Sequence, residues 1–290
     1  MGTTVLIDGH NIAFRSFYGI GDLKRSDGFP TNAIHGWYKT LYKIISQEQP
    51  DRCVAFFDAG EDQNRLAIAP QYKKNRSEMP KALQLQMPWI QKLTSAMGIT
   101  VVEKDGVEAD DVLAHYATKY SSSSKVVILS ADKDFVQIIS PSIHQLVPPP
   151  TANPRIGWRR LDPSAVTEKY GILPSQMVDY LSLVGDAVDN IPGIPGVGPK
   201  TATRWLQQFV SIDNILQNIT LIEPIRFRKI LPQWIDRLQQ NQQLISFKGN
   251  LNEPVLDPIS TDESTLREIL KAMEMNQTLK SRENQLLFSF

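Results

Sequence analysis

Short apolar runs alternate with amphipathic stretches through the first half of the chain. Apolar runs of strand length occur at 3–7, 53–57, 100–102, 125–129 and 143–147. Between them, apolar residues recur at helical spacing, most clearly over 31–48, 81–97 and 108–120. An earlier helix follows the first strand, and we expect Asn11 to cap it. This alternation predicts an α/β domain with a mostly parallel central sheet flanked by helices.

The pattern changes in the second half of the chain. From residue 162 onward it indicates helices and almost no strands, and a proline run over 148–150 marks the change. We therefore divide the chain into an α/β domain over 1–150 and a helical subdomain over 151–290. Residues 59–80 interrupt the first domain with a polar segment, where we expect a mobile loop or loosely held helices.

Composition and charge narrow the classes of protein. No apolar run is long enough to span a membrane, and the N-terminus lacks a signal pattern, so we expect a cytoplasmic protein. Cys53 is the only cysteine, which excludes intramolecular disulfides and thiolate metal sites. A formal charge of zero argues against a nucleic-acid partner. If nine acids are set aside as metal ligands, 22 acids remain against 31 basic residues. The rest of the chain would then carry a net charge of +9, which is compatible with binding nucleic acid.

Acidic side chains follow the predicted strands at their carboxyl ends. Asp8, Asp58 and Asp132 follow three different strands at their carboxyl ends. Ligands of open parallel sheets bind outside these ends, so the three acids can converge from distant positions. Other acids stand at helix starts and in nearby loops: Glu108, Asp110, Asp111, Asp134, Asp186 and Asp189.

The stretch 106–113 holds three of these carboxylates within four positions. Acids in a first helical turn complement the helix dipole, and each acid alone is more commonly a capping or loop residue. Glu108 and Asp111 share one helix face, while Asp110 points elsewhere. Two charges about 4 Å apart repel by roughly 4 kcal/mol at an effective dielectric near 20. A fold that gathers several acids therefore needs a compensating cation.

The donor types select the metal. A site made only of carboxylates suits hard cations such as Mg²⁺ or Mn²⁺. The four histidines, at positions 10, 35, 115 and 144, show no zinc-ligand spacing and are expected to be surface or partly buried side chains. Two magnesium ions can stabilise the attacking and leaving oxygens of phosphodiester hydrolysis.

A glycine- and proline-rich string over 185–202 leads into the next predicted helix. We expect Gly196 and Gly198 to form a hairpin with free backbone amides. Gly198 is further expected to need either a special backbone conformation or a close approach to phosphate. Pro199 suits a first helical position, and Lys200 adds positive charge to a helix N-terminus that can contact phosphate.

On these motifs the chain resembles the 5′ nuclease family, which includes the 5′–3′ exonuclease domain of bacterial DNA polymerase I and the flap endonucleases. The matching stretches are 7–15, 57–58, 72–76, 106–113, 130–134 and 185–202. The resemblance implies a PIN-like sheet with helices on both faces, an arch over the site at about 61–80, and a helix–three-turn–helix element in the helical subdomain. It also implies a structure-specific 5′ nuclease that cleaves DNA flaps, 5′ ends and RNA primers in replication and repair.

The resemblance further implies residue roles. The first metal would be held mainly by Asp8, Asp58, Glu108, Asp110 and Asp111, and the second mainly by Asp132, Asp134, Asp186 and Asp189. Lys73 would act in catalysis. DNA would be bound by Arg15, Arg65, Tyr72, Lys73, Arg76, Gly196, Val197, Gly198, Lys200 and Thr201. The implied cofactor is Mg²⁺, replaceable by Mn²⁺, with K⁺ at the hairpin. The implied partners are branched or 5′-ended DNA and RNA–DNA primers, bound by a monomer.

The segment 61–80 is too polar to be part of a core, and it carries the cations Arg65, Lys73, Lys74 and Arg76. One interpretation is a solvated basic loop. The other is an arch that orders around a single-stranded 5′ end and steers the scissile phosphate onto the metals. In that case Tyr72 could stack on a base.

Two other functions compete with a nuclease acting on DNA. A non-catalytic DNA-junction binder gains nothing from nine clustered acids that repel phosphate. A single-strand ribonuclease of the related small α/β class would lack the glycine-rich hairpin. The chain ends at Phe290 with no room for a polymerase, so either a stand-alone nuclease or a fragment is compatible with it.

Overall fold

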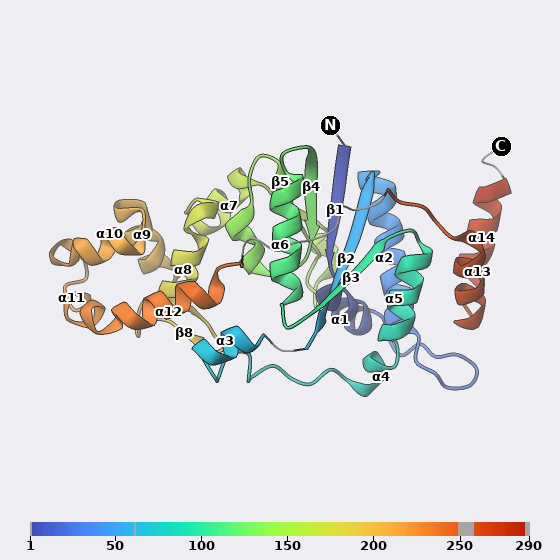
Figure 1. Cartoon of the computed structure of the whole chain (residues 1–290), viewed down its shortest axis with the longest axis horizontal. Helices are drawn as coiled ribbons and strands as arrows, with labels where there is room; N and C mark the ends of the chain where they lie inside the picture. Colours follow the sequence, from blue (N-terminus) through green and yellow to red (C-terminus); the bar gives the residue numbers. More distant parts are fainter. Residues whose placement is uncertain (1, 61, 249–257, 288–290) are drawn as a thin grey trace.

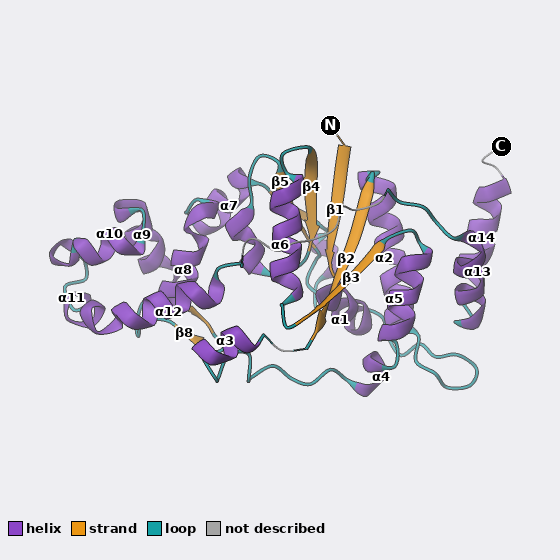
Figure 2. Ribbon diagram, viewed as in Figure 1, coloured by secondary structure: helices purple, strands orange, loops and turns teal. Residues whose placement is uncertain are grey.

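The computed structural model describes residues 2–60, 62–248 and 258–287. Residue 61 of the expected arch and residues 249–257 and 288–290 of the expected helical subdomain lie outside the described residues. A six-stranded sheet in the order β3-β2-β1-β4-β5-β6 forms the centre of the molecule (Figure 2). Its strands are β1 (Gly2–Asp8), β2 (Arg52–Ala59), β3 (Thr100–Asp105), β4 (Ser124–Leu129), β5 (Ile143–Val147) and β6 (Arg159–Leu161).

The sheet is mostly parallel, as the alternating pattern predicts. β1 to β5 pair in parallel, and β6 adds an antiparallel edge to β5. Helices α1 (Gly9–Gly19), α2 (Asn32–Glu48) and α5 (Met87–Ala96) cover one face, and α6 (Ala109–Tyr120) covers the other. Within β1, Val5 and Ile7 belong to the first core and Leu6 to the second. Burial on both faces explains why these strands are continuous apolar runs.

Two helix expectations were wrong in detail. Asp8, not Asn11, caps α1, because the Asp8 carboxylate accepts the Asn11 backbone N–H at 3.1 Å. The helix expected over 81–97 is two helices, α4 (Lys81–Gln84) and α5. Pro88 lies in the first turn of α5, a position that a helix tolerates, whereas it would break a continuous helix.

The second half of the chain builds a helical unit with its own core. Its longer helices are α7 (Pro163–Tyr170), α8 (Met177–Val184), α9 (Pro199–Phe209), α10 (Ile212–Gln217), α11 (Phe227–Ile230) and α12 (Ile235–Ile245). Short 3₁₀ segments are η1 (Lys133–Ile138), η2 (Pro154–Ile156), η3 (Pro174–Gln176), η4 (Ile219–Leu221) and η5 (Leu231–Trp234). A two-stranded hairpin of β7 (Gly185–Asp186) and β8 (Ile191–Pro192) lies between α8 and α9. Buried Trp205, Leu206 and Phe227 belong to this third core, which is separate from the two cores on the faces of the sheet.

The last helices return to the first core. α13 (Glu263–Ala272) contacts α5, and Leu266 and Ile269 join the same cluster as Trp37. Figure 1 shows α13 and α14 (Asn276–Leu287) at the opposite end of the molecule from α9 to α11. The domain boundary near residue 150 stays a prediction, and the sheet itself continues to Leu161. None of the helices in the described part of the chain is long and apolar enough to cross a membrane.

Candidate active site

The carboxyl edge of the sheet gathers acids from several elements. Asp8 ends β1, Asp58 stands near the end of β2, and Asp132 follows β4. Together with Asp110 from the first turn of α6, they line one pocket of about 610 Å³. The strand ends therefore bring together acids that lie far apart in the sequence, because parallel strands present their carboxyl ends on one side.

Three of these acids are also held by hydrogen bonds. Asp8 accepts the Ser130 hydroxyl at 2.6 Å through its second oxygen, in addition to capping α1. Asp58 accepts the Ala109 backbone N–H at 2.8 Å, and Asp132 accepts the Asp134 N–H at 2.9 Å. The same carboxylates thus accept hydrogen bonds and converge on one pocket. The hydrogen bonds fix the orientations of these carboxylates.

The buried acids carry an electrostatic cost. Burial, opposed by the Ser130 hydroxyl and reinforced by Asp132, raises the pKa of Asp8 to about 7. Burial raises the pKa of Asp110 well above its ordinary value, with the charges of Asp8 and Asp132 adding to the effect. Burial also raises the pKa of Asp132, although the Asp134 N–H opposes the shift. A nearby cation would relieve this cost.

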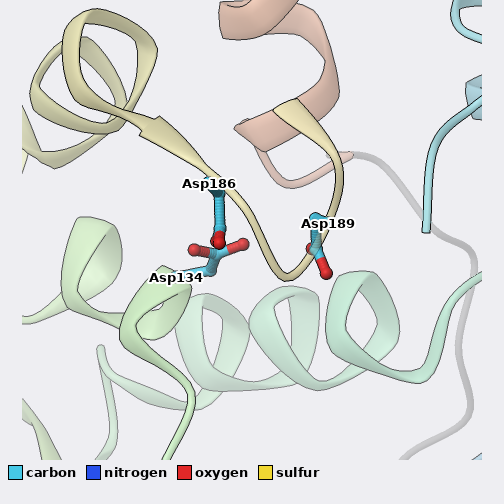
Figure 3. Close-up of side chains that lie close together, drawn as sticks. All are labelled: Asp134, Asp186 and Asp189. Atoms are coloured by element: carbon cyan, nitrogen blue, oxygen red, sulfur yellow. The ribbon is translucent and has the colours of Figure 1, made fainter. Parts of the chain in front are cut away.

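A second group of acids lies beside the first, where η1 approaches the β7–β8 hairpin (Figure 3). Asp134, Asp186 and Asp189 each offer an oxygen within 4.8 Å of the other two. Burial and neighbouring acids raise the pKa of Asp134, and its Oδ1 is buried without a hydrogen-bond partner among the described residues. Three converging carboxylates with an unpartnered oxygen fit a hard divalent cation.

Three cations from two segments approach these acids. Lys73 Nζ lies 2.8 Å from Glu108 Oε2, Arg76 Nη2 lies 2.7 Å from Asp189 Oδ1, and Lys133 Nζ lies 3.0 Å from Asp186 Oδ2. Burial lowers the pKa of Lys73, but the Glu108 charge and other neighbours outweigh it, so the net shift of the Lys73 pKa is upward. Lys73 and Arg76 belong to the segment after α3 (Gln63–Ile68), which brings them to the site.

Arg65 contradicts the expectation of a polar segment outside any core. Its side chain is only 3% exposed and forms hydrogen bonds with Asp111 at 2.7 and 2.9 Å and with Glu108 at 2.9 Å. Tyr72, expected to stack on a base, is 8% exposed and packs with the helical core. These contacts explain why the two side chains are buried. Acids at the start of α6 neutralise the Arg65 guanidinium, and the Tyr72 ring packs against apolar neighbours.

The expected hairpin residues lie between β8 and α9, and two details differ from expectation. Gly196, not Gly198, has the left-handed backbone, with φ of 81°, while Gly198 is extended with φ of −108°. The Val197 N–H is not free, because it donates to the Ile194 carbonyl at 2.9 Å. Lys200 is exposed in the first turn of α9, where Thr201 is half-buried. These residues do not line the acidic pocket, and a close approach of Gly198 to phosphate stays a prediction.

The structure adds residues that the sequence reasoning missed. His10, expected to be an ordinary surface or partly buried residue, lines the acidic pocket and accepts the Asp58 N–H through Nδ1 at 3.2 Å. Lys133 faces Asp186, as described above. Their sequence positions offered a signal, since His10 lies two residues after Asp8 and Lys133 lies between two predicted ligands. Arg15 is half-buried on α1, where burial lowers the pKa of its guanidinium.

Comparison with known proteins identifies the family. Two protein-family models match the chain. The 5′-3′ exonuclease N-terminal resolvase-like domain matches residues 3–171, and the 5′-3′ exonuclease C-terminal SAM fold matches residues 172–269. A 5′-3′ exonuclease of Aquifex aeolicus is 36% identical over 97% of this chain and 95% of its own length. Thermostable DNA polymerase I of Thermus aquaticus is 34% identical over 96% of this chain, which spans 33% of that polymerase.

A solved structure shares the fold. A bacteriophage T5 flap endonuclease, in a complex with DNA and metal ions, superposes with a TM-score of 0.67 at 20% identity. The superposition covers 84% of this chain and 88% of that one. The family models together match most of the chain, and they follow its two parts in order. The chain therefore belongs to the 5′-3′ exonuclease family of nucleases.

Proposed function

We propose that this chain is a metal-dependent, structure-specific 5′ nuclease that hydrolyses phosphodiester bonds at DNA flaps, 5′ ends and RNA primers. The observation that carries the proposal is the meeting of two acidic groups with arch cations at one edge of the sheet. A flap endonuclease with the same fold binds DNA and metal ions. Mg²⁺ as the metal, a monomeric enzyme and a cytoplasmic location are parts of the same proposal.

The acids divide naturally between two metal positions. The four acids that line one pocket would hold one ion: Asp8, Asp58, Asp110 and Asp132. Asp134, Asp186 and Asp189 would hold the other, so Asp132 moves from the second metal position to the first. Bound there, two divalent cations would stabilise the attacking and leaving oxygens of an in-line displacement at phosphorus. The raised pKa values of Asp8, Asp110, Asp132 and Asp134 support this assignment, because metal binding is the ordinary way for a protein to keep such groups ionised.

The chain's own cations would place the substrate. Lys73 and Arg76 are bonded to Glu108 and Asp189, so they stand where a phosphate would meet the acids. We expect them to exchange these carboxylates for phosphate oxygens, with Lys73 remaining protonated throughout because its pKa is raised. Lys200 and the hairpin at 196–198 would bind the phosphate backbone of duplex DNA, and the hairpin would also bind K⁺.

A non-catalytic DNA-junction binder fits less well. A binder of polyanionic DNA would be weakened by a group of buried acids on the same face, since they repel phosphate. The acids also cost stability when no cation is bound, which a binding role does not explain.

One substrate panel tests the proposal. Labelled 5′-flap DNA, blunt duplex DNA and single-stranded RNA would each be incubated with Mg²⁺, with Mn²⁺ or with a chelator, and the products mapped. We expect cleavage at the flap junction with either metal and none in chelator. Cleavage of single-stranded RNA alone would assign the chain to a different nuclease activity, and tight flap binding without cleavage would leave the DNA-junction binder.

A further inference from the structure

The buried guanidinium of Arg65 connects three parts of the molecule. Its Nη1 and Nη2 reach both oxygens of Asp111 on α6, at 2.7 and 2.9 Å. Nε donates to the Leu244 carbonyl at the end of α12 at 3.0 Å, and Nη2 donates to the Ser246 carbonyl at 3.2 Å. Arg65 itself lies on α3, at the base of the arch segment. One side chain thus ties α3, α6 and α12 together.

Both oxygens of Asp111 accept hydrogen bonds within the protein. One oxygen accepts from Arg65 Nη1, and the other accepts both Arg65 Nη2 and the Lys248 backbone N–H at 2.9 Å. The side chain is 0% exposed. A second pocket of about 530 Å³, lined by Glu108 and Lys73, lies beside the acidic pocket and shares Asp58 with it. Asp110 lines the first pocket and Glu108 the second, but Asp111 lines neither. A metal ion in these pockets can therefore reach Asp110 and Glu108 but not Asp111.

We propose that Arg65 and Asp111 form a structural clamp that fixes the base of the arch to α6 and α12, and that Asp111 binds no metal ion. Arg65 is then a positioning residue for the reaction, since the same guanidinium holds Glu108 Oε2 at 2.9 Å. A lysine could not replace it, because an ammonium lacks the planar fork that engages both oxygens of Asp111 and two carbonyls. The inference rests on the proposed function for the identity of the metal site.

The adjacent acids Asp110 and Asp111 provide a matched pair of variants. Mn²⁺ binding to the full chain, without DNA, would be counted by the electron paramagnetic resonance of the free ion. Limited proteolysis would report on the segment 62–80 in the same samples. We expect Asp110→Asn to weaken Mn²⁺ binding at least about tenfold and to leave proteolysis at its native rate. We expect Asp111→Asn to keep the native Mn²⁺ count and to raise the cleavage rate of the segment about tenfold or more.

A double variant covers the case in which Asp111→Asn does not fold. Arg65→Met with Asp111→Leu removes one buried charge of each sign, a change that cores tolerate far better than the loss of one partner. Glu108 keeps Lys73 and Asp62 keeps Lys248 as partners in this variant. We expect it to fold, to keep the native Mn²⁺ count and to expose the segment 62–80 to protease.

The possible results separate the clamp from the metal centre. Loss of a bound Mn²⁺ in either Asp111 variant, or native protease resistance of the segment in both, would overturn the clamp. If Asp110→Asn also kept native Mn²⁺ binding while the Asp111 variants opened the segment, the clamp would stand and the proposed metal centre would fall.

Discussion

Two groups of buried acids flank the first turn of α6, and they differ in how their charge is compensated. In the compensated group, Asp62, Glu108 and Asp111 contact Arg65, and Asp62 also pairs with Lys248. Burial works to raise the pKa of Asp62, but Lys248 and Arg65 outweigh it and lower the pKa. The second group has no such balance.

The uncompensated group consists of Asp8, Asp110, Asp132 and Asp134, and the pKa of each is raised chiefly by burial. Asp110 and Asp111 are neighbours in the sequence, yet they belong to different groups because successive helix positions point in different directions. The comparison teaches that an acidic motif is not one site. The protein supplies cations to one part of it and leaves the other for a ligand.

The largest expected effect is on catalysis by the uncompensated group. Asp132→Asn should reduce the single-turnover rate on flap DNA by roughly three orders of magnitude at saturating Mg²⁺, since a group that supports transition-state charge is lost. DNA affinity should stay the same or rise, because a negative charge has been removed. Asp213→Asn, an exposed acid of α10, serves as the control with a native rate. A near-native rate for Asp132→Asn would contradict the assignment.

Loss of Arg65 from the compensated group should lower the free energy of unfolding. Arg65→Met leaves Asp111 and Glu108 without their buried partner, and such a loss typically costs about 3–5 kcal/mol. Urea unfolding followed by circular dichroism measures the change. Arg155→Met, at an exposed position, should alter the free energy of unfolding by no more than about 0.5 kcal/mol. Equal stability of the two variants would show that the group is not compensated by Arg65.

The arch cations lie between the groups and should act on cleavage rather than on binding. Lys73→Ala with Arg76→Ala should slow cleavage at saturating enzyme by roughly 10²-fold, because both lose contact with the scissile phosphate. Duplex affinity, held by the hairpin at 196–198, should be nearly unchanged. Lys74→Ala, at an exposed neighbour, is the matched control. Lost duplex affinity with an unchanged rate would instead make the segment a docking surface.

The raised pKa values predict how stability depends on pH. A carboxyl whose pKa rises on folding destabilises the fold as pH increases from the unfolded value of 3.8 through the folded value, about 7 for Asp8. In chelator, the Tm should therefore fall by several degrees between pH 5 and pH 8, at about 1.4 kcal/mol per unit of pKa shift. Mg²⁺ binds the ionised acids, so it should raise the Tm more at pH 8 than at pH 5.

The control for this pH profile is Asp8→Asn, which cannot ionise. Its metal-free Tm should change less between pH 5 and pH 8 than that of the native chain. A native Tm that rises with pH in chelator would mean that the acids at the sheet edge are compensated after all.

The smallest effect concerns Lys200, which follows the turn at 196–198 and does not line the acidic pocket. Lys200→Ala should weaken duplex binding a few-fold and reduce the slope of log affinity against log salt by about one. Lys271→Ala on α13, at the other end of the molecule, should leave both quantities unchanged. An unaltered slope in Lys200→Ala would remove the hairpin lysine from the DNA contacts.

The sequence predicts a site residue correctly where its place within one element also determines its place in the fold. Asp8, Asp58 and Asp132 could be placed together because the carboxyl ends of parallel strands share one edge. The prediction failed for Arg65, whose partners include carbonyls of Leu244 and Ser246 nearly 180 positions away, a contact that no local pattern encodes. A polar segment with an arginine looks solvated until the acids that neutralise it are placed in space.

The hairpin shows a different limit. A Gly-x-Gly pattern predicts a turn, but it does not say which glycine takes the left-handed backbone. The structure gives that conformation to Gly196 and leaves Gly198 extended, since Gly198 is the residue that caps α9. The edge strand β6 was missed for a similar reason, because Arg159 and Arg160 give it no apolar run and its partner β5 defines it.

The return of α13 to the first core has a consequence for biosynthesis. The sheet is complete at Leu161, but Leu266, Ile269 and Leu270 reach its helical layer only after Glu263 has been made. At about 5–20 residues per second, a ribosome needs roughly 5–20 s to add the chain between. During that interval the α5 surface that later packs on α13 faces water. The central sheet can therefore form before α13 covers the helical layer beside it. The N-terminal part of the chain then completes its packing only after later parts have been made.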